Sequence, residues 1–154
     1  MQVSEFKTLI KTVTDAVAGK PLDAALGDAL NRLFPADGTA FKAIERACHE
    51  AIQAGWMCDR EMAGIKFGRV VKPDPDLGQY SVDVVRMKDV VGPHHSHPKG
   101  EIDMIMPITP SATFDGHGRG WFVYGPDSAH KPTVSGGDAL VLYLLPEGQI
   151  QFTK

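Results

Sequence analysis

Apolar residues in the first third of the chain recur at every third or fourth position. Three such stripes cover residues 6–17, 22–33 and 41–52, and each of them predicts an amphipathic helix. Ser4 stands where the N-cap of the first helix is expected, and Gly55 stands where the third helix should stop. This third of the chain is therefore predicted to be a helical layer that packs its apolar faces on itself and on the rest of the fold.

The period of the pattern changes at about Gly64. Beyond it, short runs of alternating or β-branched residues are separated by turns rich in Gly, Pro and Asp. We expect strands at residues 65–71, 80–87, 101–108, 120–124, 130–134, 139–145 and 149–152. Many short strands at even spacing are typical of a barrel or a sandwich. The predicted fold class is α+β, mainly β: a helical segment over residues 1–56 packs on an antiparallel β-barrel over residues 57–154, and the two form one structural unit.

The composition is that of an ordinary globular protein of 154 residues, with 43% hydrophobic and 23% charged residues. The net charge is -3 without a basic block, so neither nucleic acid nor an anionic membrane is an expected partner. We see no signal peptide and no membrane-spanning run, and we expect a cytoplasmic protein. Cys48 and Cys58 are expected to be reduced and buried, although the sequence also permits one disulfide. Exposed strand edges predict a homodimer that covers one of them.

The stretch from Gly92 to Glu101 carries the strongest chemical signal. His95 and His97 alternate, so on a strand both imidazoles face the same side, and a short turn then brings Glu101 to the start of the next strand. His130 is a fourth candidate further along the chain. Neutral imidazoles and a carboxylate suit one divalent ion, and iron, manganese, nickel and zinc all fit this donor set. The alternative reading is a histidine-rich surface loop.

These residues resemble the two sequence patterns of the cupin family, which implies a cupin-type barrel with a metal bound inside it. The first pattern is matched by Gly92, His95, His97 and Glu101, and the second by Gly120, Pro126 and His130. The resemblance implies that the metal ligands are the three histidines together with Glu101.

Four longer stretches, at residues 55–61, 92–103, 124–134 and 142–148, resemble one small cupin family that includes 4-hydroxylaminobenzoate lyase. The resemblance implies an enzyme that converts 4-hydroxylaminobenzoate and water to 3,4-dihydroxybenzoate and ammonia. Such a lyase acts on a small aromatic substrate and needs no organic cofactor, in agreement with the lack of a Gly-rich nucleotide-binding motif. A metal would serve it as a Lewis acid.

Glu101 and Asp103 are the predicted catalytic residues. They share one side of the predicted strand, so Asp103 is expected to face the cavity together with Glu101. A buried carboxyl beside a metal is suited to shuttle a proton. Equally, Asp103 is suited to orient a ligand histidine by a hydrogen bond.

Arg86, Arg119, Trp121 and Tyr124 are the predicted substrate-binding residues. Either arginine is suited to clamp a substrate carboxylate with two hydrogen bonds, and Arg86 is preferred because its neighbours are apolar. The aromatic side chains, with Tyr143 as a further candidate, are suited to stack on an aromatic ring. The competing interpretations are exposed salt bridges for the arginines and core packing for the aromatic residues.

Two other functions fit the same residues. With iron, the predicted ligand set would equally serve a metal-dependent dioxygenase, from which a lyase differs by consuming no oxygen. A cupin that binds a small molecule without catalysis, such as a sensor, would keep an aromatic pocket without needing an open metal position.

Overall fold

The computed structural model describes residues 1–153, and its N-terminal third is helical as predicted. The helices are α1 (Val3–Val17), α2 (Ala24–Leu33) and α3 (Thr39–Ala54). Ser4 was wrongly predicted as a cap: α1 is capped by Gln2, whose backbone N–H donates to Glu5 Oε1 at 3.0 Å. Gly55 ends α3 in the left-handed conformation with φ 87°. Among residues 1–153, none of the helices has the length and apolarity needed to cross a membrane.

The strands pair antiparallel throughout and form two sheets. The larger sheet has the order β1-β2-β3-β9-β5-β7, with β6 also paired to β9. Its strands are β1 (Arg60–Met62), β2 (Ile65–Val71), β3 (Tyr80–Val91), β5 (Glu101–Pro107), β6 (Thr113–Phe114), β7 (Gly120–Tyr124) and β9 (Thr133–Pro146). The smaller sheet has the order β10-β4-β8, formed by Gln151–Phe152, His95–His97 and Ser128–His130 respectively.

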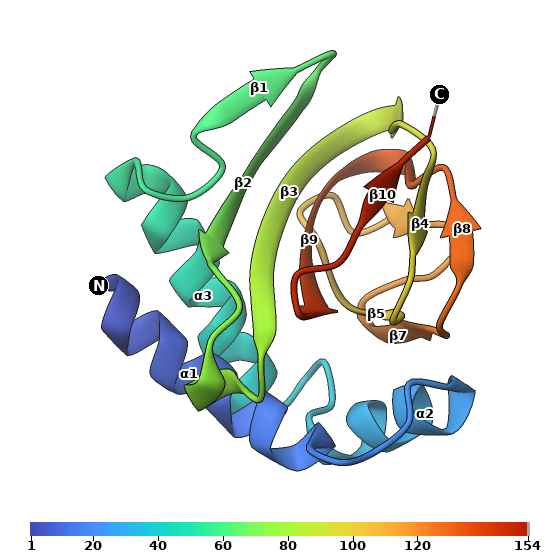
Figure 1. Cartoon of the computed structure of the whole chain (residues 1–154). Coiled ribbons are helices and arrows are strands. Elements are labelled where there is room, and N and C mark those ends of the chain that lie inside the picture. The colour runs from blue at the N-terminus through green and yellow to red at the C-terminus, as the bar shows by residue number, and fades with distance from the viewer. Residues whose placement is uncertain (154) are drawn as a thin grey trace.

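The small sheet lies opposite the concave side of β3 and β9, and the helices lie beyond the large sheet (Figure 1). The fold is thus a cupin-type β-sandwich with an N-terminal helical segment. The predicted single barrel needs one correction, because among residues 1–153 the inter-strand hydrogen bonds form two sheets and do not close into one. The short β4, β8 and β10 supply the second face, where each pairs over only two or three residues.

Alternation along β9 divides the apolar core in two. The residues Leu140, Leu142 and Leu144 face the helices, whereas Val141, Tyr143 and Leu145 face the space between the sheets. Each fully buried side chain of this size contributes about 1.5–3 kcal/mol of hydrophobic stabilisation. Helices and large sheet therefore share one core, and the inner face of the sheet is left to line the candidate site.

The predicted strand at residues 130–134 is wrong. β8 ends at His130 and β9 begins at Thr133, with Pro132 in the break. Proline has no N–H to give to a ladder, and here the Pro132 carbonyl instead accepts from Gly92 N–H at 2.6 Å. β3 and β9 are longer than predicted because they pair with each other at both ends, across a register shift between Lys88 and Val90.

Candidate metal centre

Three neighbouring segments bring the four predicted ligands together. His95 and His97 alternate on β4, so both rings face the space between the sheets, and His130 is the ladder partner of His95 on β8. Glu101 opens β5 after a tight turn at Gly100, where φ is +90°. A Cβ at Gly100 would lie 2.7 Å from the Tyr124 carbonyl oxygen, so the turn that places Glu101 requires glycine at this position.

The donor atoms of the four residues all lie within 4.8 Å of one another. His97 Nε2 is 3.3 Å from Glu101 Oε2, and His130 Nε2 is 3.1 Å from His95 Nε2. The side chains of His97 and Glu101 are fully buried, and that of His130 is 10% exposed. The cluster is thus a compact, water-poor set of nitrogen and oxygen donors, unlike the surface loop of the alternative reading.

Each histidine ring is held by its other nitrogen. His95 Nδ1–H donates to the Pro93 carbonyl at 3.3 Å, and His97 Nδ1–H donates to Ser128 Oγ at 2.9 Å. Ser128 Oγ–H itself donates to the Gly125 carbonyl at 2.6 Å, so it accepts from the ring. These acceptors fix the Nδ1–H tautomer and leave each Nε2 lone pair directed at the centre.

The third histidine is held by Asp115, which sequence reasoning left in a polar loop. His130 Nδ1–H donates to Asp115 Oδ2 at 2.5 Å, and the Tyr124 hydroxyl donates to the same oxygen. The backbone N–H of Thr133 donates to Asp115 Oδ1 at 2.8 Å. Burial raises the pKa of Asp115, but these hydrogen bonds outweigh burial and lower it. Asp115 is therefore an ionised carboxylate that orients His130.

The chemistry of the donor set fits a borderline divalent cation. Burial and the neighbouring histidines lower the pKa of His95 to about 4 and that of His97 to about 3, so both rings are neutral at pH 7. His97 Nε2 and both Glu101 oxygens are buried without a hydrogen-bond partner among residues 1–153. Buried polar atoms are costly unless they are paired, and an ion held by these atoms would pair them.

Asp103 lies two residues beyond Glu101 on β5 and is also fully buried. Burial first, and then the nearby Glu101 charge, raises the pKa of Asp103 well above its ordinary value. Two buried carboxyls at this spacing do not both ionise, so we assign the proton to Asp103 and the charge to Glu101. Both Asp103 oxygens, like those of Glu101, lack a hydrogen-bond partner among residues 1–153, so the Asp103 proton is free to take part in the predicted proton transfer.

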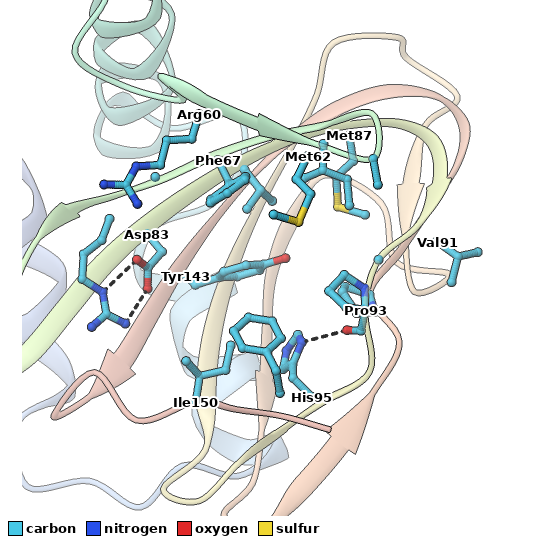
Figure 2. Close-up of a pocket in the computed structure, with 18 residues that line it drawn as sticks. Arg60, Met62, Phe67, Asp83, Met87, Val91, Pro93, His95, Tyr143 and Ile150 are labelled. Carbon is cyan, nitrogen blue, oxygen red and sulfur yellow. Dashed lines mark hydrogen bonds and ion pairs between the residues drawn. The ribbon is translucent and has the colours of Figure 1, made fainter. Parts of the chain in front are cut away.

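A cavity of about 760 Å³ opens beside the centre and is lined by His95. Figure 2 shows Tyr143 in the middle of this cavity, with Phe67 and Met87 on the large-sheet side and His95 and Ile150 on the other. Most of the lining side chains are apolar. The cavity is thus suited to a flat, largely apolar molecule with one end at the histidine cluster.

The structure brings one of the four predicted substrate-binding residues to the centre. The Tyr124 ring lies 5.4 Å from the His97 ring and 4.5 Å from the His130 ring, measured between centroids. Trp121 faces the opposite side of β7, where its Nε1–H donates to the Phe34 carbonyl at 2.9 Å. It packs in the helical core, as the competing interpretation held.

The two predicted arginines lie outside the cavity lining. Arg86 pairs with Asp138, with Nη2 2.8 Å from Oδ2, on the ladder between β3 and β9. Arg119 pairs with Glu45, with Nη1 2.6 Å from Oε2, and lies over the Phe41 ring. Both are therefore engaged in salt bridges, the alternative that the sequence left open for them.

Comparisons with known proteins find relatives over most of the chain. The chain is 28% identical over 152 residues to a 4-hydroxylaminobenzoate lyase of Nocardioides sp. (strain LMS-CY), covering 93% of this chain and 88% of that protein. A 4-hydroxylaminobenzoate lyase of Pseudomonas putida is 26% identical over 153 residues, covering 88% and 87%. An RmlC-like cupin protein of Ralstonia eutropha JMP134 is similar in structure, with a TM-score of 0.46 and 14% identity over 60% of this chain and 61% of that chain.

The family model described as PnbB, 4-hydroxylaminobenzoate lyase, matches residues 8–152. This match runs from α1 to β10 and includes all four residues of the histidine and glutamate cluster. The chain therefore belongs to the 4-hydroxylaminobenzoate lyase family of enzymes.

Proposed function

We propose that this chain is a metal-dependent lyase that converts 4-hydroxylaminobenzoate and water to 3,4-dihydroxybenzoate and ammonia. The observation that carries the proposal is the buried cluster of three histidines and Glu101 beside an apolar cavity, in a chain of this family. The reaction adds one water, releases one ammonia and involves no net oxidation, so it needs no organic redox cofactor.

His95, His97, Glu101 and His130 would hold the ion. When bound, a divalent ion supplies Lewis-acid assistance to the departure of the N-hydroxyl oxygen. The residues of the chain hold the ligands and shield the substrate. The hydrogen bonds of the three histidine Nδ1 atoms keep the Nε2 lone pairs directed at the ion site. The apolar lining of the cavity keeps bulk water away from the substrate ring.

Proton transfer falls to the carboxyl pair. The N-hydroxyl oxygen must gain a proton to leave as water, and a water must lose a proton as it adds to the ring carbon beside the nitrogen. A second water then hydrolyses the resulting imine at the carbon that bears the nitrogen, and the nitrogen gains protons to leave as ammonia, so that one water is consumed overall. Asp103 holds a proton next to Glu101 in a fully buried position. Such a pair can release and recover a proton without contact with solvent, the role that general acid–base catalysis requires.

The test is an anaerobic turnover assay. Protein loaded with one metal at a time is mixed with 4-hydroxylaminobenzoate, and 3,4-dihydroxybenzoate and ammonia are quantified. Equal amounts of both products are expected without oxygen, and a His97→Gln variant should form neither. Product that appears only with oxygen would contradict the lyase function and support the dioxygenase. Tight binding of 4-hydroxylaminobenzoate without turnover would support a cupin that binds a small molecule without catalysis.

A further inference from the structure

The cavity is lined by two arginines and one aspartate, so its positive charges outnumber its negative ones. Arg69 Nε and Nη2 donate to the two oxygens of Asp83 at 2.9 and 3.1 Å, and Nη2 also donates to the Gly148 carbonyl. The charges of Arg69 and Asp83 thus offset each other within the wall. Arg60 also lines the cavity, and it makes no salt bridge with any residue of the described chain.

The strand pairing places Arg60 on the side of β1 that lines the cavity, where it remains exposed to solvent. On β1 it stands opposite Phe67 of β2, and Met62 stands opposite Ile65; all four residues line the cavity. Because paired residues of antiparallel strands share a face, the intervening Glu61 points the other way. In Figure 2 Arg60 lies near Phe67 and Asp83, with Tyr143 between it and His95. The unpaired cation and the histidine cluster thus lie at two different ends of one apolar cavity.

We infer that Arg60 binds the carboxylate of the substrate and selects para-substituted benzoates over uncharged aromatic rings. This inference rests on the proposed function, in which one end of the ring must reach the histidine cluster. The other end carries a carboxylate, and an anion that leaves water needs a cation or several donors. A guanidinium gives a carboxylate two parallel hydrogen bonds, and Phe67 and Tyr143 flank the ring.

The other cations fit this role less well. Arg69 already binds a carboxylate, because its Nε and Nη2 both donate to Asp83. Arg86 and Arg119, the arginines predicted from the sequence, lie outside the cavity lining in their own salt bridges. Arg60 is therefore the specificity-determining residue in place of both.

The experiment compares Arg60→Ala and Arg60→Lys with Lys66→Ala. Lys66 carries the same charge on the same hairpin, opposite Glu61, and does not line the cavity. With 4-hydroxylaminobenzoate, Arg60→Ala should raise KM by at least about tenfold with little change in kcat, since the contact is alike in ground and transition states. Arg60→Lys should recover part of the loss, and Lys66→Ala should match wild type.

The uncharged substrate N-phenylhydroxylamine distinguishes loss of the carboxylate contact from general damage to the structure, which would lower the activity with both substrates. Wild type and Arg60→Ala should have similar kcat/KM for it, so that the preference for the carboxylated substrate collapses only in the Arg60 variants. An equal loss with both substrates, or an unchanged KM for 4-hydroxylaminobenzoate, would overturn the inference.

Calorimetry with the inert probes 4-aminobenzoate and aniline tests the carboxylate subsite separately from the lyase reaction. If wild type turns over nothing, weaker binding of 4-aminobenzoate to Arg60→Ala, with unchanged binding of aniline, still supports the carboxylate subsite. Equal affinity of wild type and Arg60→Ala for 4-aminobenzoate overturns it, whatever the fate of the lyase reaction.

Discussion

Each histidine of the candidate metal centre uses one ring nitrogen to contact the protein and directs the other at the centre. The acceptors differ in strength: a backbone carbonyl for His95, a serine hydroxyl for His97 and a carboxylate for His130. A carboxylate acceptor raises the basicity of a ligand imidazole more than a neutral oxygen does. We therefore expect His130 to depend most on its partner.

Asp115→Asn tests this dependence. The variant loses the negative charge that accepts from His130 and Tyr124. Affinity for Zn²⁺, used as a probe and measured by chelator competition, should fall by about 10–100-fold. Asp127→Asn is the matched control, because Asp127 is an exposed aspartate in the turn before β8. Equal affinity of the two variants would show that Asp115 does not support the centre.

The lowered pKa of His97, about 3, predicts a pH effect on the metal-free protein. Between that value and 6.5, the unfolded chain binds a proton at this residue and the folded chain does not. Stability is thus present above pH 6.5 and is lost as the pH falls. From pH 7 to pH 5, wild type should lose about 2 kcal/mol relative to His97→Gln, which cannot titrate. Urea unfolding in the presence of a chelator measures the difference, and parallel pH curves would contradict it.

At the scale of elements, the sequence predicted those site residues that lie close together along the chain. His95, His97 and Glu101 were found because alternation and one short turn bring them together, and these are properties of neighbouring residues. Asp115 lies 15 residues before its partner, and only the pairing of β6 and β8 with other strands brings it near. No spacing rule in the sequence connects such a pair.

Both faces of β7 are apolar, and this explains why Trp121, predicted to bind the substrate, packs in the helical core instead. In a strand of this kind the alternation is clear, but the sequence does not say which set of residues faces the cavity. Trp121 and Val123 face the helices, whereas Phe122 and Tyr124 face the centre. Arg60 was missed for a related reason: β1 has only three residues, too few for a recognisable pattern.

One side chain joins the helical segment to β7 and predicts a local contribution to stability. Asn31 of α2 accepts from Trp121 N–H at 2.9 Å and donates to the Trp121 carbonyl at 3.0 Å. Asn31→Ala leaves both backbone groups unpaired and should cost about 1–2 kcal/mol of unfolding free energy in urea. Arg32→Ala, an exposed change on the same helix, should cost much less, and Zn²⁺ affinity should be the same in both. A larger loss in Arg32→Ala would contradict the assigned role of Asn31.

At the scale of the whole molecule, an ion in the centre should act as a folding ligand. Zn²⁺ at about a hundred times its dissociation constant stabilises the folded state by about 2.7 kcal/mol, which for a chain of this size raises the melting temperature by roughly 5–10 °C. Thermal unfolding with Zn²⁺ and with a chelator measures the shift. His97→Ala should show almost none, and an equal shift in that variant would place the ion elsewhere.

The homodimer stays a prediction. β1 is an edge of the large sheet, all three of its residues are exposed, and Met62 is 70% exposed. An edge of this kind invites a second strand. Light scattering at working concentration should give twice the mass of the chain, and a monomeric mass would exclude the dimer.

The position of β1 has a consequence for the evolution of the family. β1, which carries Arg60, pairs only with β2, and Arg60 and Met62 belong to neither apolar core. On the inference that Arg60 binds the substrate carboxylate, a change at either residue should alter which molecules the cavity binds, while the buried residues of the two cores stay as they are. Substitutions on β1 can thus change substrate preference with little loss of stability. Relatives that act on uncharged hydroxylamines should differ from this chain first at residue 60.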